Sequence, residues 1–419
     1  MNTQVISIVI FTGVIVSIIT EKVNRTVAAL CGAVLMILTH VLSLEEGISH
    51  IDFNTLGVLI GMMIVVSVVR NSGLFEFIAI YTAKKTKGDP WKIMVCFIII
   101  TAVLSAILDN VTTVLLIGPM TIVICRILEI NPVPFLITEI MASNIGGTAT
   151  LIGDPPNIMI GSAANLTFTD FIVNLGPVVV IILFASIICF KFIYKKQLLL
   201  NHTSTNLDHL DENKAIKDKP LLIKSICVLF LILLGFMLHS QLGIESSVIA
   251  LTGGAVMLLI GKQDADEIIS NVEWNTIVFF ACLFVVVGGL QESGVIYELA
   301  TKLVDLTKEN MTLAIILILW LSAIISSFLD NIPFVATLIP LILTMQAEGV
   351  DVAPIWWATS LGACLGGNGT LIGASANVVL AGIGDKHGYP ISFKKYFKIG
   401  FPIMLLTIAI STVYLLIKF

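Results

Sequence analysis

The stretch LDNVTTVLLIGP, from Leu108 to Pro119, places an aspartate, an asparagine and two threonines in an apolar run of membrane-spanning length. The chain later reads LDNIPFVATLIP, from Leu329 to Pro340, with an aspartate and an asparagine at the matching places. Ionisable residues are costly at bilayer depth, and they usually face the protein interior and serve an ion or substrate pathway. The recurrence therefore predicts one polar site inside a membrane, built from two copies.

The overall composition is that of a polytopic membrane protein. Of the 419 residues, 57% are hydrophobic and 12% are charged, the mean hydropathy is +1.03, and a soluble chain is about a quarter charged. The net charge of −5 is small, so nucleic acid binding has no support. The seven cysteines form no C-x-x-C pair, which argues against a disulfide framework or a zinc site. The sequence has no H-E-x-x-H, G-x-S-x-G or Walker A pattern, so we do not expect an enzyme.

The chain is an internal duplication. Asp109 and Asp330 are separated by 330 − 109 = 221 positions, and the segments that start at Asn54 and Asn275 differ by the same offset. The offset then becomes 220, because GGTATLIGDPPN from Gly146 matches GGNGTLIGASAN from Gly366. We therefore expect two structurally equivalent halves.

Each half supplies five apolar segments that can span a membrane, together with a pair of runs that flank an Asp-Asn tip. The runs 92–108 and 111–128, and likewise 311–329 and 332–346, are expected to form re-entrant hairpins. The predicted fold is an all-α polytopic membrane protein, an inverted repeat with about 10 spans plus 2 hairpins. Residues 1–194 form the first repeat, 195–220 a cytoplasmic linker and 221–419 the second repeat. The predicted spans lie near 4–20, 27–43, 54–70, 135–165, 171–194, 221–241, 246–261, 275–291, 353–383 and 396–418.

Loop charges orient this topology. Five spans are an odd number, so the second half is inverted relative to the first. Most loop lysines and arginines, Lys22 and Arg25 among them, then fall on one side. This predicts a multi-pass protein of the plasma membrane, with both termini outside and the linker 195–220 cytoplasmic. The N-terminal segment has no basic n-region and no small-residue cleavage signal, so we expect it to be a retained first span.

One span in each half is expected to be broken. Adjacent Pro155 and Pro156 remove two N–H donors, and Gly146, Gly147 and Gly153 permit tight turns. The predicted result is a half-helix, an unwound stretch and a second half-helix, which must line protein or a water-filled cavity. The second copy keeps the glycines and lacks the prolines.

The residues at these tips and breaks can bind ions. A half-helix N-terminus favours an anion, whereas carbonyl, Asn and Thr oxygens can replace the hydration shell of Na⁺. A Na⁺ site would lie near Asn110, Asn144, Asn331 and Asn368, and the amides should set ion affinity more than folding. The predicted substrate and ion site comprises Asp109, Asn110, Thr112, Thr113, Asn144, Gly147, Thr148, Asp154, Asn157, Asp330, Asn331, Gly367, Asn368, Thr370, Ser375 and Asn377.

Three carboxylates are expected at this depth: Asp109, Asp154 and Asp330. Proton or cation coupling would fall on them. Asp154 has Ala374 as its counterpart, so it is the candidate for a single titrating group. The alternative is that Asp154 only caps the half-helix that begins at Pro155.

These motifs resemble the ion transporter superfamily, in particular the ArsB/NhaD permease group and the prokaryotic relatives of the melanosomal P protein. The resemblance rests on SAILDNVTTVLLIGPMTIVIC, NIGGTATLIGDPPN, SSFLDNIPFVATLIP, LGACLGGNGTLIGASANVV and HGYPISF. It implies an inverted-repeat fold with two re-entrant hairpins, elevator-like alternating access and a homodimer.

The hairpin tips depart from the pattern of the related divalent anion/sodium symporters. Those symporters have a Ser-Asn-Thr motif, where this chain has Asp109-Asn110-Val111 and Asp330-Asn331-Ile332. The added carboxylates would repel a di-anionic substrate unless they are neutralised. This departure argues against a dicarboxylate substrate.

The sequence predicts a secondary transporter of a small inorganic ion or metalloid oxyanion, of the arsenite or antimonite efflux type, with H⁺ or Na⁺ as coupling ion and no other cofactor. Trivalent arsenic favours thiolates, and only Cys364 lies near the motifs, so hydroxyls and amides would hold neutral arsenous acid. The alternatives are a Na⁺/H⁺ antiporter and a passive, chloride-type anion pathway.

Overall fold

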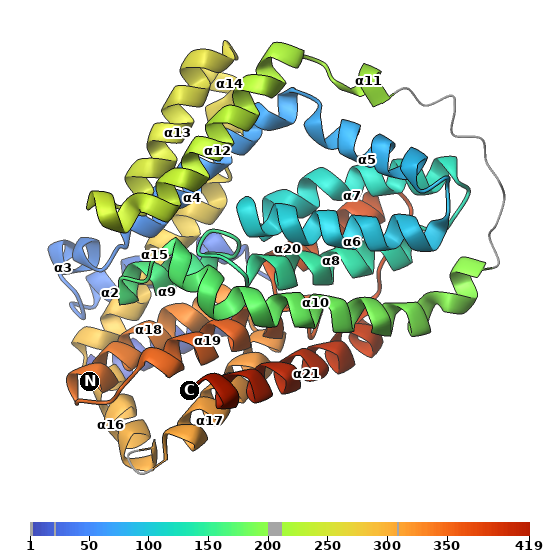
Figure 1. Ribbon diagram of the computed structural model, residues 1–419. Helices are drawn as coiled ribbons and strands as arrows, with labels where there is room; N and C mark the ends of the chain where they lie inside the picture. The colour runs from blue at the N-terminus through green and yellow to red at the C-terminus, as the bar shows by residue number, and fades with distance from the viewer. Residues whose placement is uncertain (1–2, 21, 200–211, 308–309) are drawn as a thin grey trace.

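The computed structural model describes residues 3–20, 22–199, 212–307 and 310–419, and every regular element in these ranges is a helix (Figure 1). The first half contains α1 (Thr3–Thr20), α2 (Arg25–Leu38), α3 (Leu44–Ser49), α4 (Phe53–Asn71), α5 (Leu74–Lys85), α6 (Pro90–Ile107), α7 (Asn110–Ile127), α8 (Val133–Gly147), α9 (Pro155–Ala164) and α10 (Phe168–Leu199). The short helix α11 (Glu212–Ala215) follows. The second half contains α12 (Lys219–Leu242), α13 (Ser246–Gly261), α14 (Ala265–Ser270), α15 (Trp274–Glu292), α16 (Val295–Thr307), α17 (Met311–Phe328), α18 (Asn331–Ala347), α19 (Ala353–Gly366), α20 (Ser375–Lys386) and α21 (Phe393–Lys418).

The helices are those of a multi-pass membrane protein. Among the described residues, nine helices are long and apolar enough to cross a membrane: α1, α4, α6, α7, α10, α12, α15, α17 and α21. Helices α2, α13 and α18 are apolar and shorter. The predicted all-α membrane fold is confirmed, and the short helices α3, α5, α14 and α16 lie between the predicted segments.

One group of helices consists of α1, α2, α4, α12, α13 and α15. Within it, α4 packs on α13 and α15 packs on α2. Because α15 is the repeat counterpart of α4 and α13 is that of α2, these two contacts are equivalent. A Cβ at Gly61 would lie 2.3 Å from the carbonyl carbon of Ala250, so glycine lets the backbones of α4 and α13 approach closely. Figure 1 shows α4, α12 and α13 side by side at the upper left. We call this group the scaffold.

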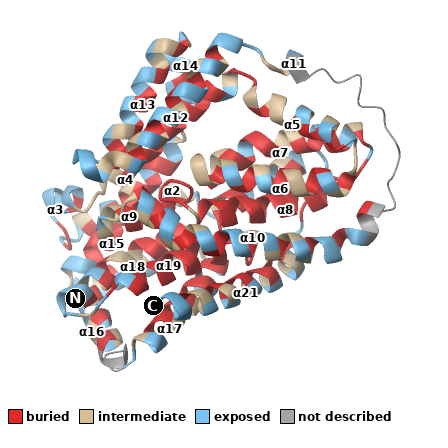
Figure 2. Ribbon diagram, viewed as in Figure 1, coloured by how far each residue is buried: buried red, intermediate tan, exposed pale blue. Residues whose placement is uncertain are grey.

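The second group contains the hairpins and the broken helices. Helix α6 packs on α8 and α17 packs on α19, while α7 packs on α20 and α18 on α9, across the two halves. Figure 2 shows α8 and α19 in the buried interior, with more exposed faces on α10 and α21. We call helices α6 to α9 and α17 to α20 the hairpin bundle.

The predicted interruptions are present in both copies. Helix α8 ends at Gly147 and α9 starts at Pro155, and in the second half α19 ends at Gly366 and α20 starts at Ser375. The order of helices is repeated, with α1 to α10 corresponding to α12 to α21. The inverted orientation of the halves stays a prediction, and so do the repeat boundaries. The predicted linker 195–220 lies partly outside the described residues.

Candidate ion and substrate site

The two aspartates at the hairpin tips are helix caps. Asp109 Oδ1 accepts a hydrogen bond of 2.8 Å from the backbone N–H of Thr112, at the start of α7. Asp330 Oδ1 accepts one of 3.2 Å from the N–H of Ile332, at the start of α18. A carboxylate at this position is stabilised by the unpaired N–H groups and the positive end of the helix dipole. Each cap also places the next residue, an asparagine, at the very tip.

Asn144 is the centre of a buried amide cluster. Its Nδ2 donates hydrogen bonds of 2.9 Å to Asn368 Oδ1 and to Asn377 Oδ1. Its Oδ1 accepts a bond of 3.3 Å from Asn110 Nδ2. Asn110 Oδ1 is buried and has no hydrogen-bond partner among the described residues. The first hairpin tip and both broken helices therefore meet at one point, where one amide oxygen still has capacity to bind.

The unwound segments are held by matching hydrogen bonds in the two halves. Asn157 Nδ2 donates to the carbonyl oxygen of Thr150 at 2.9 Å, and Asn377 Nδ2 donates to that of Thr370 at 2.9 Å. Asn377 Nδ2 also donates to the Gly367 carbonyl at 2.7 Å. These two amides satisfy carbonyls that an interrupted helix leaves free, so they support the site as well as line it.

Asp154 joins the first half to the second. It stands at the N-cap position of α9, yet its side chain makes no capping hydrogen bond. Both of its carboxylate oxygens lie 3.3 Å from Nδ2 of Asn331, at the tip of the second hairpin. The side chain is completely buried. The alternative interpretation, that Asp154 only caps α9, is therefore not supported, because the capping hydrogen bond is absent.

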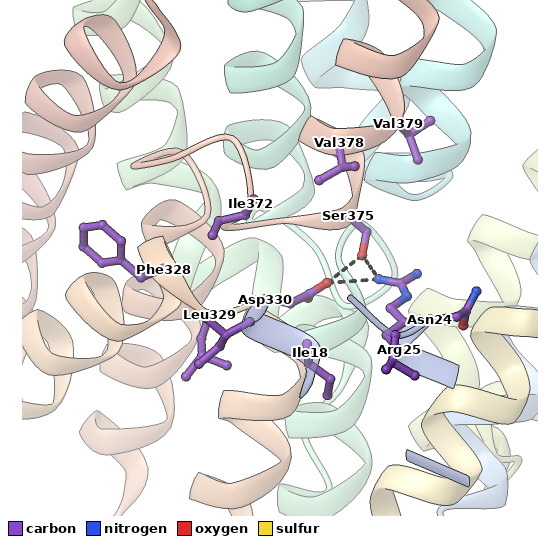
Figure 3. A pocket seen from close by; sticks show the side chains of 12 residues that line it. Ile18, Asn24, Arg25, Phe328, Leu329, Asp330, Ile372, Ser375, Val378 and Val379 are labelled. Atoms are coloured by element: carbon purple, nitrogen blue, oxygen red, sulfur yellow. Dashed lines mark hydrogen bonds and ion pairs between the residues drawn. The ribbon is translucent and has the colours of Figure 1, made fainter. Parts of the chain in front are cut away.

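Asp330 is neutralised by a residue of the scaffold. Arg25 Nη1, at the start of α2, lies 3.0 Å from Asp330 Oδ2, and Ser375 Oγ donates to the same oxygen at 2.8 Å (Figure 3). Arg25 also contacts Ser375, and its Nη2 lies 3.4 Å from Thr276 Oγ1. These groups border a cavity of about 400 Å³ between the end of α1, the second hairpin tip and α20. Sequence analysis counted Arg25 only as a loop charge.

The remaining predicted residues belong to the same hairpin tips and broken helices. Thr148 Oγ1 donates to the Asn144 carbonyl at 2.7 Å, and the buried Thr113 hydroxyl has no hydrogen-bond partner among the described residues. Gly147 and Gly367 pack against the backbone of Gly153 and Gly373. Thr112 contributes its backbone N–H to the Asp109 cap. Among the described residues, no three His, Cys, Asp or Glu side chains lie close enough together to hold a metal ion. The candidate cation ligands here are amide, carbonyl and carboxylate oxygens.

Sequence analysis did not place Arg25, Ser360 or Glu139 in this region, and it named Cys364 only as lying near the motifs. Ser360 Oγ donates to Asn157 Oδ1 at 2.6 Å, and Cys364 Sγ lies 3.5 Å from the same atom. Glu139, on the same helix as Asn144, is fully buried. It is a buried carboxyl group in addition to the three that the sequence predicts, Asp109, Asp154 and Asp330. A lone glutamate inside an otherwise apolar span was the available signal.

A family model described as citrate transporter, CitMHS, matches residues 15–362. This chain belongs to the CitMHS citrate transporter family. An uncharacterized transporter of Mycobacterium tuberculosis strain H37Rv is 42% identical over 99% of both chains. The human P protein is 34% identical over 99% of this CitMHS chain and 60% of its own length. The resemblance to the ion transporter superfamily is confirmed, and these relatives make the CitMHS chain a secondary transporter by family.

A solved structure gives independent support for the fold. The YdaH transporter of Alcanivorax borkumensis superimposes on 90% of this CitMHS chain and 87% of its own, with a TM-score of 0.63 at 14% identity. At that identity the likeness concerns the fold alone.

Proposed function

We propose that the amide cluster around Asn144 is the binding site of a secondary active transporter that couples a small anion to H⁺ or Na⁺. The observation that carries this proposal is that two hairpin tips and two broken helices converge on buried amides and one carboxylate, Asp154. Such a centre holds neutral oxygens for a cation beside N-termini of half-helices for an anion. Asp154 is hydrogen-bonded to an amide rather than to a cationic side chain, so its carboxyl group is available to a coupling ion.

The proposed movement is elevator-like alternating access, in which the hairpin bundle slides along the scaffold. Equivalent edges of the scaffold contact non-equivalent places on the broken helices. Asn54 Nδ2 lies 3.3 Å from Ser162 Oγ on α9, whereas the opposite edge, at Arg25, meets Ser375 on α20. In the first half, the position that corresponds to Ser375 is 375 − 220 = 155. The two contact points on the broken helices therefore differ by 162 − 155 = 7 residues.

This offset supports a sliding transition. Seven helical residues span about 10 Å, so the bundle is displaced toward one edge of a scaffold whose helices are related by the repeat. Exchange of the two contacts would bring Asn275, the counterpart of Asn54, to Gly382, the counterpart of Ser162. The exchanged state would open the site to the other face of the membrane.

Two substrate classes fit the site. A metalloid oxyanion such as arsenite or antimonite could bind as a neutral acid to the amides and hydroxyls. A carboxylate anion is favoured by the family match to citrate transporters. The Arg25–Asp330 ion pair removes one of the repulsive charges that argued against such a substrate.

Na⁺/H⁺ exchange is the second candidate function. It is favoured by Asp154, a buried carboxylate whose partner is the Asn331 amide, because carboxylate and amide oxygens suit Na⁺ and the carboxylate alone can bind H⁺. A passive anion pathway would use the same dipoles and would show flux that follows the voltage alone.

We also propose the cellular setting that the sequence predicts. The multi-pass chain would lie in the plasma membrane as a homodimer, with both termini outside and the linker 195–220 in the cytoplasm. The basis is the lysine and arginine bias of the loops and the implied likeness to dimeric relatives.

Proteoliposome flux tests the proposed function. Purified protein would be tested with arsenite, citrate, Na⁺ and chloride under imposed pH and Na⁺ gradients. Uptake of one anion above its equilibrium level, driven by a cation gradient, is the expected result. Na⁺ movement against H⁺ without an anion would favour the second candidate, and flux set only by voltage would overturn active transport.

A further inference from the structure

Glu139 is a buried carboxyl group outside the amide cluster. It lies on α8 with 1% of its surface exposed. The hydroxyl of Thr121, on α7, donates a hydrogen bond to its Oε1. Its Oε2 is buried and has no hydrogen-bond partner among the described residues. An ionised carboxylate in such a place is costly, and a neutral acid much less so.

The fold does not need a carboxyl group at this position. In the second half the place of Glu139 is taken by Thr359, since 139 + 220 = 359, and the place of Thr121 by Ile342, since 121 + 221 = 342. The equivalent helices α18 and α19 pack against each other with Ile342 and Thr359 at these positions. The costly residue therefore occurs in one copy only, which is typical of a functional rather than a packing role.

Glu139 has no cationic side chain as an ion-pair partner among the described residues. Glu139 itself acts electrostatically on the thiol of Cys125 on α7. The other described titratable side chains on the helices that pack on α8 are Lys92 and Cys96 of α6, Arg126 of α7, Asp170, Cys189, Lys191, Tyr194 and Lys195 of α10, Cys364 of α19, and Asp385 and Lys386 of α20. Tyr396 of α21 belongs to the same buried cluster.

Glu139 is also connected to the amide cluster. It precedes Asn144 by five residues, about 7.5 Å along the same helix. Its hydrogen-bond partner Thr121 belongs to the helix that starts at the hairpin tip residue Asn110. A change of charge at Glu139 therefore alters the contact between the first hairpin and the broken helix that carries Asn144.

We propose that Glu139 is a proton-binding site that couples H⁺ to transport, separate from the ion site at Asp154. The carboxylate takes one proton from water on one side of the membrane and becomes a neutral acid. It releases that proton to water on the other side, so one H⁺ crosses in each cycle. This inference rests on the proposed function, since it assigns the coupling proton of the same transporter.

Infrared spectroscopy of the purified full-length protein tests proton binding without any substrate. A carboxylic-acid band should disappear as the pH is raised, and it should be absent from Glu139→Gln and retained in Asp154→Asn. In Thr121→Val the carboxylate loses its hydrogen-bond donor, which disfavours the ionised form, so the band should persist to higher pH. A band that stays in Glu139→Gln, or one assigned to Glu139 that never titrates, would overturn the inference. If Glu139→Gln does not fold, the shift in Thr121→Val decides.

Proton movement tests the coupling role. Proteoliposomes containing a trapped pH dye would receive gradients of Na⁺, arsenite or citrate, and Glu139→Gln should reduce proton movement to the level of protein-free liposomes. Wild-type proton movement in this variant would contradict the inference. If the wild-type protein moves no proton in any gradient while the band titrates, the coupling role of Glu139 is overturned and only its proton binding stands. Na⁺-driven anion uptake in the same proteoliposomes would then still support the proposed function, and its absence as well would overturn that function.

Discussion

Arg25 and Asp330 form an ion pair with an N–O distance of 3.0 Å, although 305 residues separate them in the chain. Arg25 opens a scaffold helix, and Asp330 caps the tip of the second hairpin. The pair therefore ties the part of the protein that is proposed to move to the part that is proposed to stay fixed, and its loss should be felt in transport.

We predict that Arg25→Gln and Asp330→Asn each reduce transport, because each leaves the other side chain without its ion-pair partner. The double variant should lose less than the sum of the two, with a coupling free energy of about 0.5 to 3 kcal/mol. A double-mutant cycle on initial transport rates measures this. Lys22→Gln is the matched control, since it removes an exposed charge three residues away. Strictly additive losses would mean that the two residues act separately.

Cysteine cross-linking should detect the two positions of the hairpin bundle. In a cysteine-free background, Asn54→Cys with Ser162→Cys should cross-link in the conformation described here, where the two side chains are in contact. Asn275→Cys with Gly382→Cys should cross-link only in the exchanged state, and a Cβ at Gly382 has open space around it. Coupling ions should change the ratio of the two products. A failure of the second pair under every ionic condition would exclude the proposed exchange of contacts.

The buried amides should separate into two groups when they are replaced by alanine. Asn110→Ala and Asn144→Ala should raise the half-saturating ion concentration, because their oxygens face the cluster. Asn157→Ala and Asn377→Ala leave backbone carbonyls without donors, which should also lower the free energy of unfolding by about 1 to 3 kcal/mol. Transport kinetics and thermal unfolding in detergent distinguish the groups. Equal stability of all four variants would show that the unwound segments do not depend on these amides.

Asp154→Asn should strongly reduce transport driven by the coupling-ion gradient while substrate exchange is partly retained. The change is nearly isosteric, so Asn331 keeps a partner and the loss reports the charge. Gradient-driven uptake and exchange in the same proteoliposomes provide the two readouts. Asp109→Asn is a useful comparison, because that carboxylate is committed to a backbone N–H. If Asp154→Asn leaves coupled uptake intact, Asp154 is reduced to a structural residue.

The repeat made much of the fold predictable. Helix caps and helix breaks depend on neighbouring residues in the chain. They could therefore be predicted from the Asp-Asn tips, the glycines, and Pro155 with Pro156. The broken helices at 148–154 and 367–374 accordingly lie where the motifs indicated. The duplication also predicted that amides of both halves form one site, as Asn144 does with Asn368 and Asn377.

The partners of Arg25 and Glu139 could not be predicted in the same way. Arg25 meets Asp330 only after the scaffold and the second hairpin have packed, and one sequence carries no record of contacts at that separation. The position of Glu139 inside an apolar span was a signal in the sequence, but its partner could not be predicted, because Thr121 lies on another helix. Asp154 was identified, but its contact with Asn331 of the other half depends on how the two copies interlock.

The seven-residue offset between the two scaffold contacts has an electrical consequence. A site that travels about 10 Å through about 30 Å of hydrocarbon carries each unit charge across roughly a third of the field. At 100 mV that is about 0.8 kcal/mol per charge. With Asp154 ionised and no ion bound, the empty site would move a negative charge, whereas one bound Na⁺ would cancel it. The membrane potential would then act mainly on the return of the empty carrier.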